Sequence, residues 1–100
     1  MTLDQTWKKC IAMWVKIVKN LDKGTVKELK QKYVDDGTLC NCYFCQYNVD
    51  HGGIEGRCDE CPGRLVKKGF NCAKGTYSYQ TKPKKFLEKL LELDEIRRQK

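Results

Sequence analysis

The sequence has few of the residues on which catalysis and membrane insertion most often depend. It contains one histidine and two prolines, and none of its apolar runs reaches the roughly 18 residues that a membrane-spanning helix needs. It has no serine in a nucleophile-elbow setting, no phosphate-binding glycine loop and no carboxylate cluster beside an open metal position. We therefore expect a protein that is not an enzyme, takes no small-molecule substrate and does not enter a membrane.

The features of secreted proteins are also missing. Charged residues, among them Asp4, Lys8 and Lys9, interrupt every apolar run near the start, so no signal-peptide pattern is present. The sequence has no N-x-S/T glycosylation acceptor, and its cysteine count of 7 is odd, which would leave one thiol outside any set of disulfides. We expect a cytoplasmic protein whose cysteines are reduced and available as metal ligands.

Cysteine is what the sequence has in excess, and nearly all of it lies between Cys40 and Cys72. Two C-x2-C pairs are separated by 12 residues, a spacing that suits a four-coordinate zinc site, because each short turn lets two thiolates converge on one ion. The sequence therefore predicts one structural Zn²⁺ ion held by Cys42, Cys45, Cys58 and Cys61.

Other ligand sets and other thiol chemistries stay open at this point. Cys72 could replace one member of a pair, Cys40 could replace Cys42, and His51 is the only histidine that could contribute. Iron bound by the same thiolates, disulfides and a redox dithiol are the alternatives to zinc. Cys10 lies near two tryptophans and is expected to be a core residue.

The remaining sequence predicts helices on both sides of the cysteines. We expect a single domain over residues 1–100, with a helical hairpin at 5–36, a cysteine-rich zinc-binding region at 38–81 and a C-terminal helix at 83–98. The predicted fold class is a small α-rich (α+β) domain, in which two N-terminal helices and one C-terminal helix flank a zinc-knuckle or ribbon-like region with short strands. Thr25 and Glu28 form a predicted capping box, and Gly24 separates the first two helices.

The buried faces of these helices are predicted from apolar residues at three- and four-residue intervals. They are Trp7, Ile11, Trp14, Val15, Val18 and Leu21 in the first helix, Val26, Leu29, Tyr33 and Val34 in the second, and Phe86, Leu87, Leu90, Leu91 and Leu93 in the last.

The formal net charge of +7 points to an acidic partner. Both helical ends of the chain are more basic than its middle, and a partner surface is predicted at Arg64, Lys67, Lys68, Lys82, Lys84 and Lys85. Two classes of partner fit. One is a host protein attracted by the basic charge. The other is nucleic acid, whose bases could stack on the aromatic rings of Tyr43, Phe44, Tyr47, Tyr77 and Tyr79.

A resemblance adds to this interpretation. The order of Cys42, Cys45, Cys58, Cys61, Pro62, Gly69, Cys72 and Tyr77 resembles small, zinc-finger-like proteins encoded by bacteriophages, which are largely uncharacterised. The likeness covers most of the chain, except that Cys40 departs from the pattern. It implies a zinc-binding viral accessory or regulatory protein that acts in the host cytoplasm, and it supports Cys72 as a candidate ligand. It does not indicate a particular activity.

Overall fold

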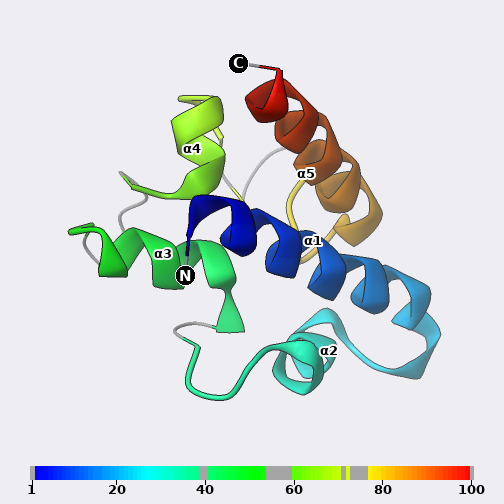
Figure 1. Ribbon diagram of the computed structural model, residues 1–100. Coiled ribbons are helices and arrows are strands. Elements are labelled where there is room, and N and C mark those ends of the chain that lie inside the picture. The colour runs from blue at the N-terminus through cyan, green and yellow to red at the C-terminus, as the bar shows by residue number, and fades with distance from the viewer. Residues whose placement is uncertain (1, 39–40, 54–59, 71, 73–76, 100) are drawn as a thin grey trace.

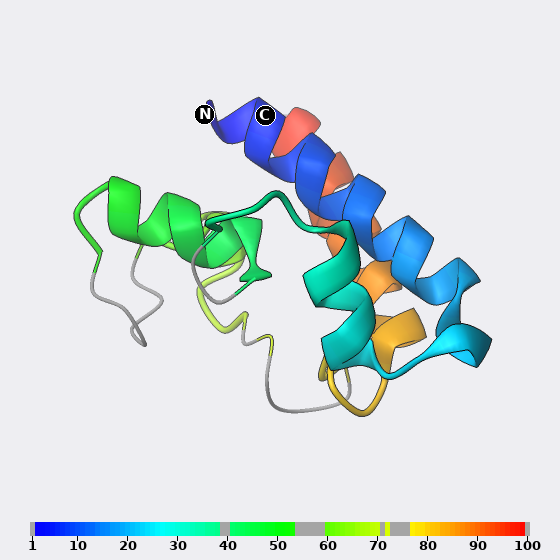
Figure 2. The same cartoon turned by 90° about the horizontal axis from the view of Figure 1, so that it is seen from below.

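The helices of the protein pack around a central N-terminal helix. A computed structural model describes residues 2–38, 41–53, 60–70, 72 and 77–99 (Figures 1 and 2). The elements are α1 (Leu3–Lys19), the short 3-10 helix η1 (Leu21–Lys23), α2 (Val26–Tyr33), α3 (Tyr43–Asp50), α4 (Pro62–Val66) and α5 (Pro83–Arg98). Helix α1 packs against α2, α3, α4 and α5, so one face of α1 forms much of the core.

Helix α1 begins at a capping box and buries a broad apolar face. The Thr2 hydroxyl accepts a hydrogen bond from the Gln5 backbone N–H at 3.1 Å, and the Gln5 side chain accepts one from the Thr2 backbone N–H at 2.9 Å. The predicted burial of the two tryptophans is confirmed, but the rest of the buried face differs from the prediction. It consists of Trp7, Cys10, Met13, Trp14 and Ile17, whereas Ile11, Val15 and Val18 are only partly buried.

Helix α5 lies alongside α1 in the opposite direction (Figures 1 and 2). Near the start of α5, the Phe86 ring packs against Trp14 with ring centroids 4.8 Å apart. Near its end, Arg97 lies over the Trp7 ring and forms an ion pair with Asp4 at 3.1 Å. Leu90 and Leu93 are buried between these two contacts, as predicted, whereas Leu91 is 47% exposed.

Helix α2 covers the C-terminal half of α1 and confirms the predicted capping box. The Glu28 backbone N–H donates to the Thr25 hydroxyl, and the Glu28 carboxylate accepts from the Thr25 backbone N–H at 2.9 Å. Leu29 contributes to the core, and the neighbouring Lys30 is also buried, although its side chain is charged.

The fold prediction for the central region is wrong. In place of a ribbon-like region with short strands, the described part of residues 38–81 contains α3 and α4, and the described chain as a whole is helical without strands. The physical reason is that a C-x2-C spacing also equals about one helical turn, so Cys42 and Cys45 can begin a helix. Tyr43, Phe44 and Asn48 then share its buried face.

Helix α4 begins with Pro62, whose missing N–H is not needed in a first helical turn. Its Gly63 lies directly against Phe70, because a Cβ atom at this position would stand 2.5 Å from the Phe70 ring. The Arg64 Nε donates to the Phe70 carbonyl at 3.1 Å, which fixes the chain that leaves α4. In the part of the chain that the structure describes, no helix combines the length and apolarity needed to cross a membrane.

Candidate functional site

Cys42 and Cys45 lie at the N-terminal end of α3. Cys42 is the N-cap residue in an extended conformation, and Cys45 lies in the first turn. The side chain of Cys45 hydrogen bonds to the Cys42 sulfur. Helix α3 therefore begins with two thiols in contact, which is the arrangement that half of a thiolate metal site requires.

The surroundings of Cys42 favour its thiolate form. The hydrogen bond from Cys45 is the largest influence that lowers the pKa of Cys42, and the positive charge of Lys30 and the backbone N–H groups of Cys45 and Phe44 lower it further. These effects outweigh burial, which acts in the opposite direction, and bring the pKa to about 6. At neutral pH Cys42 is mostly ionised, and the thiolate is the form that binds metals and acts as a nucleophile.

More thiols approach this position from other elements. Cys61 is the N-cap residue of α4 and is 7% exposed, and Cys72 is partly buried beside the core. Burial raises the pKa of Cys10 well above its ordinary value, and the nearby Cys42, Cys61 and Cys72 raise it further. The prediction that Cys10 is a core residue is confirmed, because its side chain is 1% exposed.

The described residues do not contain a complete metal site. Among them, no group of three or more His, Cys, Asp and Glu side chains is placed to hold a metal ion. The predicted ligand Cys58 and the alternate Cys40 lie outside the described residues. Of the predicted set, the structure brings Cys42 and Cys45 into contact and places Cys61 at the start of the next helix.

His51 does not join the thiols. It is the C-cap residue of α3, so the length of the helix, about 12 Å at 1.5 Å per residue, separates it from Cys42. Its ring stacks on Tyr47 with centroids 3.8 Å apart, and its Nδ1 lies 3.0 Å from the Tyr47 carbonyl oxygen. Because the ligands of one zinc ion lie within about 2.3 Å of it, His51 and Cys42 cannot share an ion in this conformation.

The predicted basic residues lie in two groups on different parts of the fold. Arg64 belongs to α4, with Lys67 and Lys68 directly after it, and residues of α4 meet Arg97 near the end of α5. Lys82, Lys84 and Lys85 lie at the start of α5 and are exposed. Helix α5 has 16 residues and a length of about 24 Å, so the structure does not join the two groups into one compact patch.

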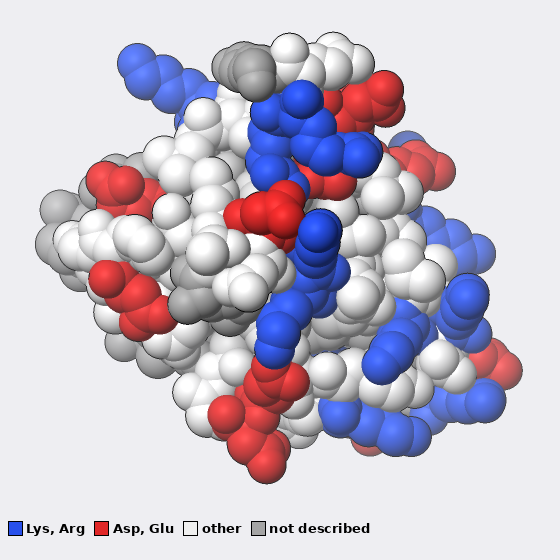
Figure 3. Space-filling view, in the orientation of Figure 1, with Lys and Arg blue, Asp and Glu red and all other residues white. Residues whose placement is uncertain are grey.

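A different set of lysines surrounds the start of α5. The contacts of Phe86 with Trp14 and of Tyr79 with Lys30 place this segment beside α2 and the C-terminal half of α1. Positively charged side chains gather on this side of the molecule, over the end of α1 and α2, and few acidic ones lie among them (Figure 3). We call this surface the basic end, and its exposed lysines are Lys16, Lys19, Lys23, Lys27, Lys32, Lys82, Lys84 and Lys85.

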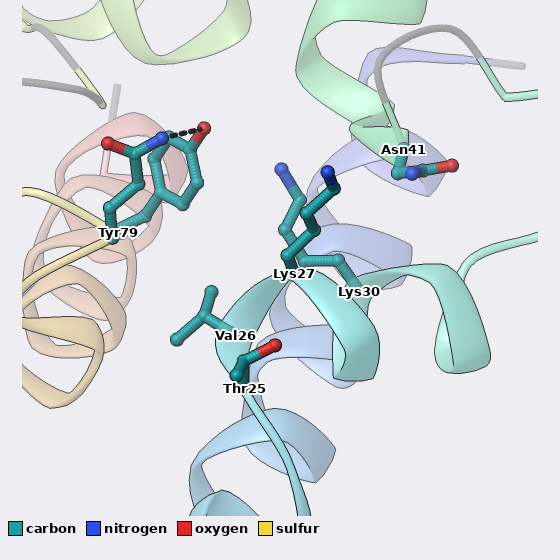
Figure 4. Close-up of a pocket in the computed structure, with 7 residues that line it drawn as sticks. Thr25, Val26, Lys27, Lys30, Asn41 and Tyr79 are labelled. Carbon is teal, nitrogen blue, oxygen red and sulfur yellow. Dashed lines mark hydrogen bonds between the residues drawn. The ribbon is translucent and has the colours of Figure 1, made fainter.

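A groove of about 510 Å³ lies within the basic end, and sequence reasoning did not identify it. Its walls come from α2 and from the segment that precedes α5 (Figure 4). The lining residues are Thr25, Val26, Lys27, Lys30, Asn41, Tyr79 and Gln80. The one available signal was the pair Lys27 and Lys30, which the i, i+3 spacing places on neighbouring positions of a helix.

The aromatic rings that could have stacked on bases have other contacts. Tyr43 and Phe44 are 4% and 3% exposed and belong to the core. The Tyr77 ring stacks on Phe70 with centroids 5.8 Å apart.

Comparisons with known proteins found no family model, no curated protein and no solved structure that matches this chain.

Proposed function

We propose that the protein is a small basic zinc protein, in which one Zn²⁺ ion bound by cysteine thiolates stabilises the fold and a basic surface binds a macromolecule. The observation that carries this proposal is the contact between Cys42 and Cys45 at the start of α3, with the pKa of Cys42 lowered to about 6. Two soft thiolate ligands in contact favour zinc or iron over the hard cations Mg²⁺ and Ca²⁺.

The second half of the zinc site is proposed to come from Cys58 and Cys61, with Cys72 as the alternate ligand. Cys61 and Cys72 support this assignment because both lie near Cys10, as Cys42 does. A zinc ion with four thiolate ligands has no open position, so it stabilises the fold without activating water. This role agrees with a protein that is not an enzyme.

The macromolecular part of the proposal is supported by the basic end. Its lysines come from α1, α2 and the start of α5, which the fold brings together. Lysines placed on one face attract an acidic partner and speed its association. The resemblance to bacteriophage proteins suggests the setting, an accessory or regulatory protein that acts on a host macromolecule in the host cytoplasm.

The metal is tested by elemental analysis and native mass spectrometry of the full chain purified in reductant. We expect one zinc ion per chain, and we expect Cys45→Ser and Cys61→Ser to lose the ion and to melt at a lower temperature, because a structural zinc ion contributes folding free energy. Cys10→Ala is the matched control, since it removes a thiol that is not a proposed ligand. The metal proposal fails if the chain carries no metal, or if Cys45→Ser keeps both its zinc and its melting temperature.

A thiol redox function is the second candidate, and the low pKa of Cys42 favours it specifically. In that case Cys42 and Cys45 would form a disulfide with each other through thiol–disulfide exchange. The same samples decide between the two functions. A metal-free chain that forms a Cys42–Cys45 disulfide when the reductant is removed supports the redox function and contradicts the zinc proposal.

A further inference from the structure

The groove at the basic end combines positive charge with a concave shape. Lys27 and Lys30 extend from α2 with their ammonium groups directed to the same space, and Tyr79 lies on the facing wall (Figure 4). The Lys30 Nζ lies 4.3 Å from the centroid of the Tyr79 ring. The groove therefore presents two ammonium groups to whatever enters it.

Lys30 is unusual because it is buried without a carboxylate partner. Lys30 is 9% exposed, and among the described residues no Asp or Glu oxygen lies within 4.0 Å of its side-chain nitrogen. Buried charges in proteins are generally paired, and the group of opposite charge near Lys30 is the Cys42 thiolate, whose pKa the Lys30 charge lowers. The Lys30 ammonium group also faces the groove beside that of Lys27, so an anion that enters the groove meets two positive charges.

The other polar groups of the groove also suit an anion. The Gln80 amide donates to the Tyr79 hydroxyl at 3.2 Å, and Asn41 is a further polar residue of the lining. The nearest described carboxylate on α2, that of Glu28, already accepts a hydrogen bond from the Thr25 backbone N–H at 2.9 Å. The described lining of the groove thus has two ammonium groups and no carboxylate, which disfavours cations.

We propose that this groove binds a phosphate group in the backbone of a single-stranded nucleic acid, with Lys27 and Lys30 as the binding residues. The inference rests on the proposed function, because it names the macromolecule that the basic end binds. The exposed lysines around the groove would contact neighbouring phosphates, so a chain with repeated negative charge fits the basic end better than a single free phosphate does.

The composition of the basic end also predicts how the nucleic acid is bound. Its charged donors are all lysines. The basic end therefore has no arginine that could make the bidentate contacts by which proteins recognise guanine. Lysines in a recess reach a flexible backbone that can enter it, as in proteins that bind single strands without sequence preference. We expect binding that is independent of base sequence and strongly dependent on salt.

The test is fluorescence anisotropy of a labelled, mixed-sequence single-stranded oligonucleotide with the full chain at several salt concentrations. We expect Lys27→Gln together with Lys30→Gln to weaken binding about tenfold or more and to reduce the salt slope by about 0.7, which corresponds to the loss of one neutralised phosphate. The matched control is Lys67→Gln together with Lys68→Gln, which makes the same change in charge outside the groove and should weaken binding less than about twofold.

Single variants keep the test informative if loss of the buried lysine disturbs folding. Lys27 is exposed, so Lys27→Gln should fold normally and still weaken binding, and Lys30→Arg keeps the charge and should bind better than Lys30→Gln. Equal losses in the groove variant and the control variant would overturn the inference. So would displacement of the oligonucleotide by inorganic phosphate at low millimolar concentration, or equal binding of poly-glutamate.

The two proposals can fail separately. A chain that holds zinc but binds no oligonucleotide, or binds it independently of Lys27, overturns this inference and leaves the zinc site. A metal-free chain that binds oligonucleotide through Lys27 overturns the zinc site and supports the groove.

Discussion

The half of the molecule that contains α1 and α5 differs from the half that contains α3 and α4 in the length of its helices and in the interactions that stabilise them. Helices α1 and α5 have 17 and 16 residues and pack through large apolar side chains, such as Trp14 and Phe86. Helices α3 and α4 have 8 and 5 residues, too few to be stable alone. The Phe44 ring of α3 packs on Trp7 with centroids 4.8 Å apart, and polar contacts also tie these helices to their surroundings, among them the hydrogen bond from the Glu60 backbone N–H to the Asn48 side chain at 2.7 Å.

The cysteines follow the same division. In the α1–α5 half, Cys10 is a buried thiol with a raised pKa and behaves as a small apolar side chain. In the α3–α4 half, Cys42 has a lowered pKa and a thiol partner. The half with the shorter helices is therefore the half whose thiols are prepared for chemistry, which is where a metal ion would contribute most to stability.

The largest loss of stability should come from removing an apolar contact of the α1–α5 half. Trp14→Ala is expected to lower the free energy of unfolding by about 3–5 kcal/mol, because it removes a fully packed aromatic side chain. Urea denaturation followed by circular dichroism measures the change. Leu91→Ala is the control, since Leu91 is 47% exposed, and it should change stability by less than about 0.5 kcal/mol. Equal effects of the two substitutions would show that α1 and α5 are not held by their apolar faces.

The corresponding change in the α3–α4 half removes a polar contact. Asn48→Ala is expected to cost about 1–3 kcal/mol, because the part-buried Glu60 N–H loses the acceptor that the buried Asn48 side chain provides. In Asn48→Ala, hydrogen exchange of the α3 amides should speed up relative to the parent protein by more than that of the α1 amides. Gln46→Ala is the control, since its amide donates to Asp50 on the exposed side of the same helix. Faster exchange in α1 to the same degree would contradict the division of the molecule into two halves.

The part of the fold that could be predicted from the sequence is the part with local signals. The capping box of Thr25 and Glu28 fixes the start of α2, and Pro83 fixes the start of α5. The buried face of α1 was only partly predictable, because apolar residues lie on more than one side of this helix. Packing against α3 and α5 selects Cys10 and Ile17 over Ile11 and Val18, and that choice depends on contacts distant in sequence.

The candidate site divides in the same way. The thiol pair Cys42 and Cys45 was identified from its spacing, but the spacing fits both a turn and a helix, and the helix formed because Tyr43, Phe44 and Asn48 are buried together. The groove could not be predicted, because it needs the contact between Lys30 and Tyr79, which lie far apart in the sequence. Lysine on a helix is normally solvated, so the pattern alone gave no reason to select Lys30.

Thiol reactivity gives a sharper form of the comparison in the reduced, metal-free chain. With a pKa of about 6, Cys42 is about nine-tenths thiolate at pH 7, whereas a thiol with an ordinary pKa near 8.5 is only a few per cent ionised. We expect Cys42 to be alkylated by iodoacetamide about two- to threefold faster than an equally accessible ordinary thiol, since the lower nucleophilicity of a low-pKa thiolate offsets most of the gain. Cys10 should react only when the protein unfolds. Peptide mass spectrometry over time measures both rates.

The pH dependence of this reaction has a defined sign. Because the folded pKa of Cys42 lies below its unfolded value, its thiolate stabilises the fold at high pH, and this contribution is lost as the pH falls through about 6. The alkylation rate should fall over the same range. Cys45→Ala removes the hydrogen bond to Cys42 and should move the midpoint of the profile to higher pH. An unchanged midpoint would show that Cys45 does not stabilise the thiolate.

The smallest change in stability is expected at the two capping boxes, where the same interaction occurs at the start of α1 and at the start of α2. The Thr2 hydroxyl accepts from Gln5 at 3.1 Å in α1, and the Thr25 hydroxyl accepts from Glu28 at 3.2 Å in α2. Thr25→Ala is expected to cost about 1 kcal/mol, and Thr2→Ala less, because fraying of the first turn of α1 leaves the Trp14 contacts intact. Since Thr25 carries no charge, its removal should leave the salt slope of oligonucleotide binding unchanged. Urea denaturation of both variants tests the order, and a larger cost for Thr2→Ala would show that the start of α1 contributes more to stability than its apolar face implies.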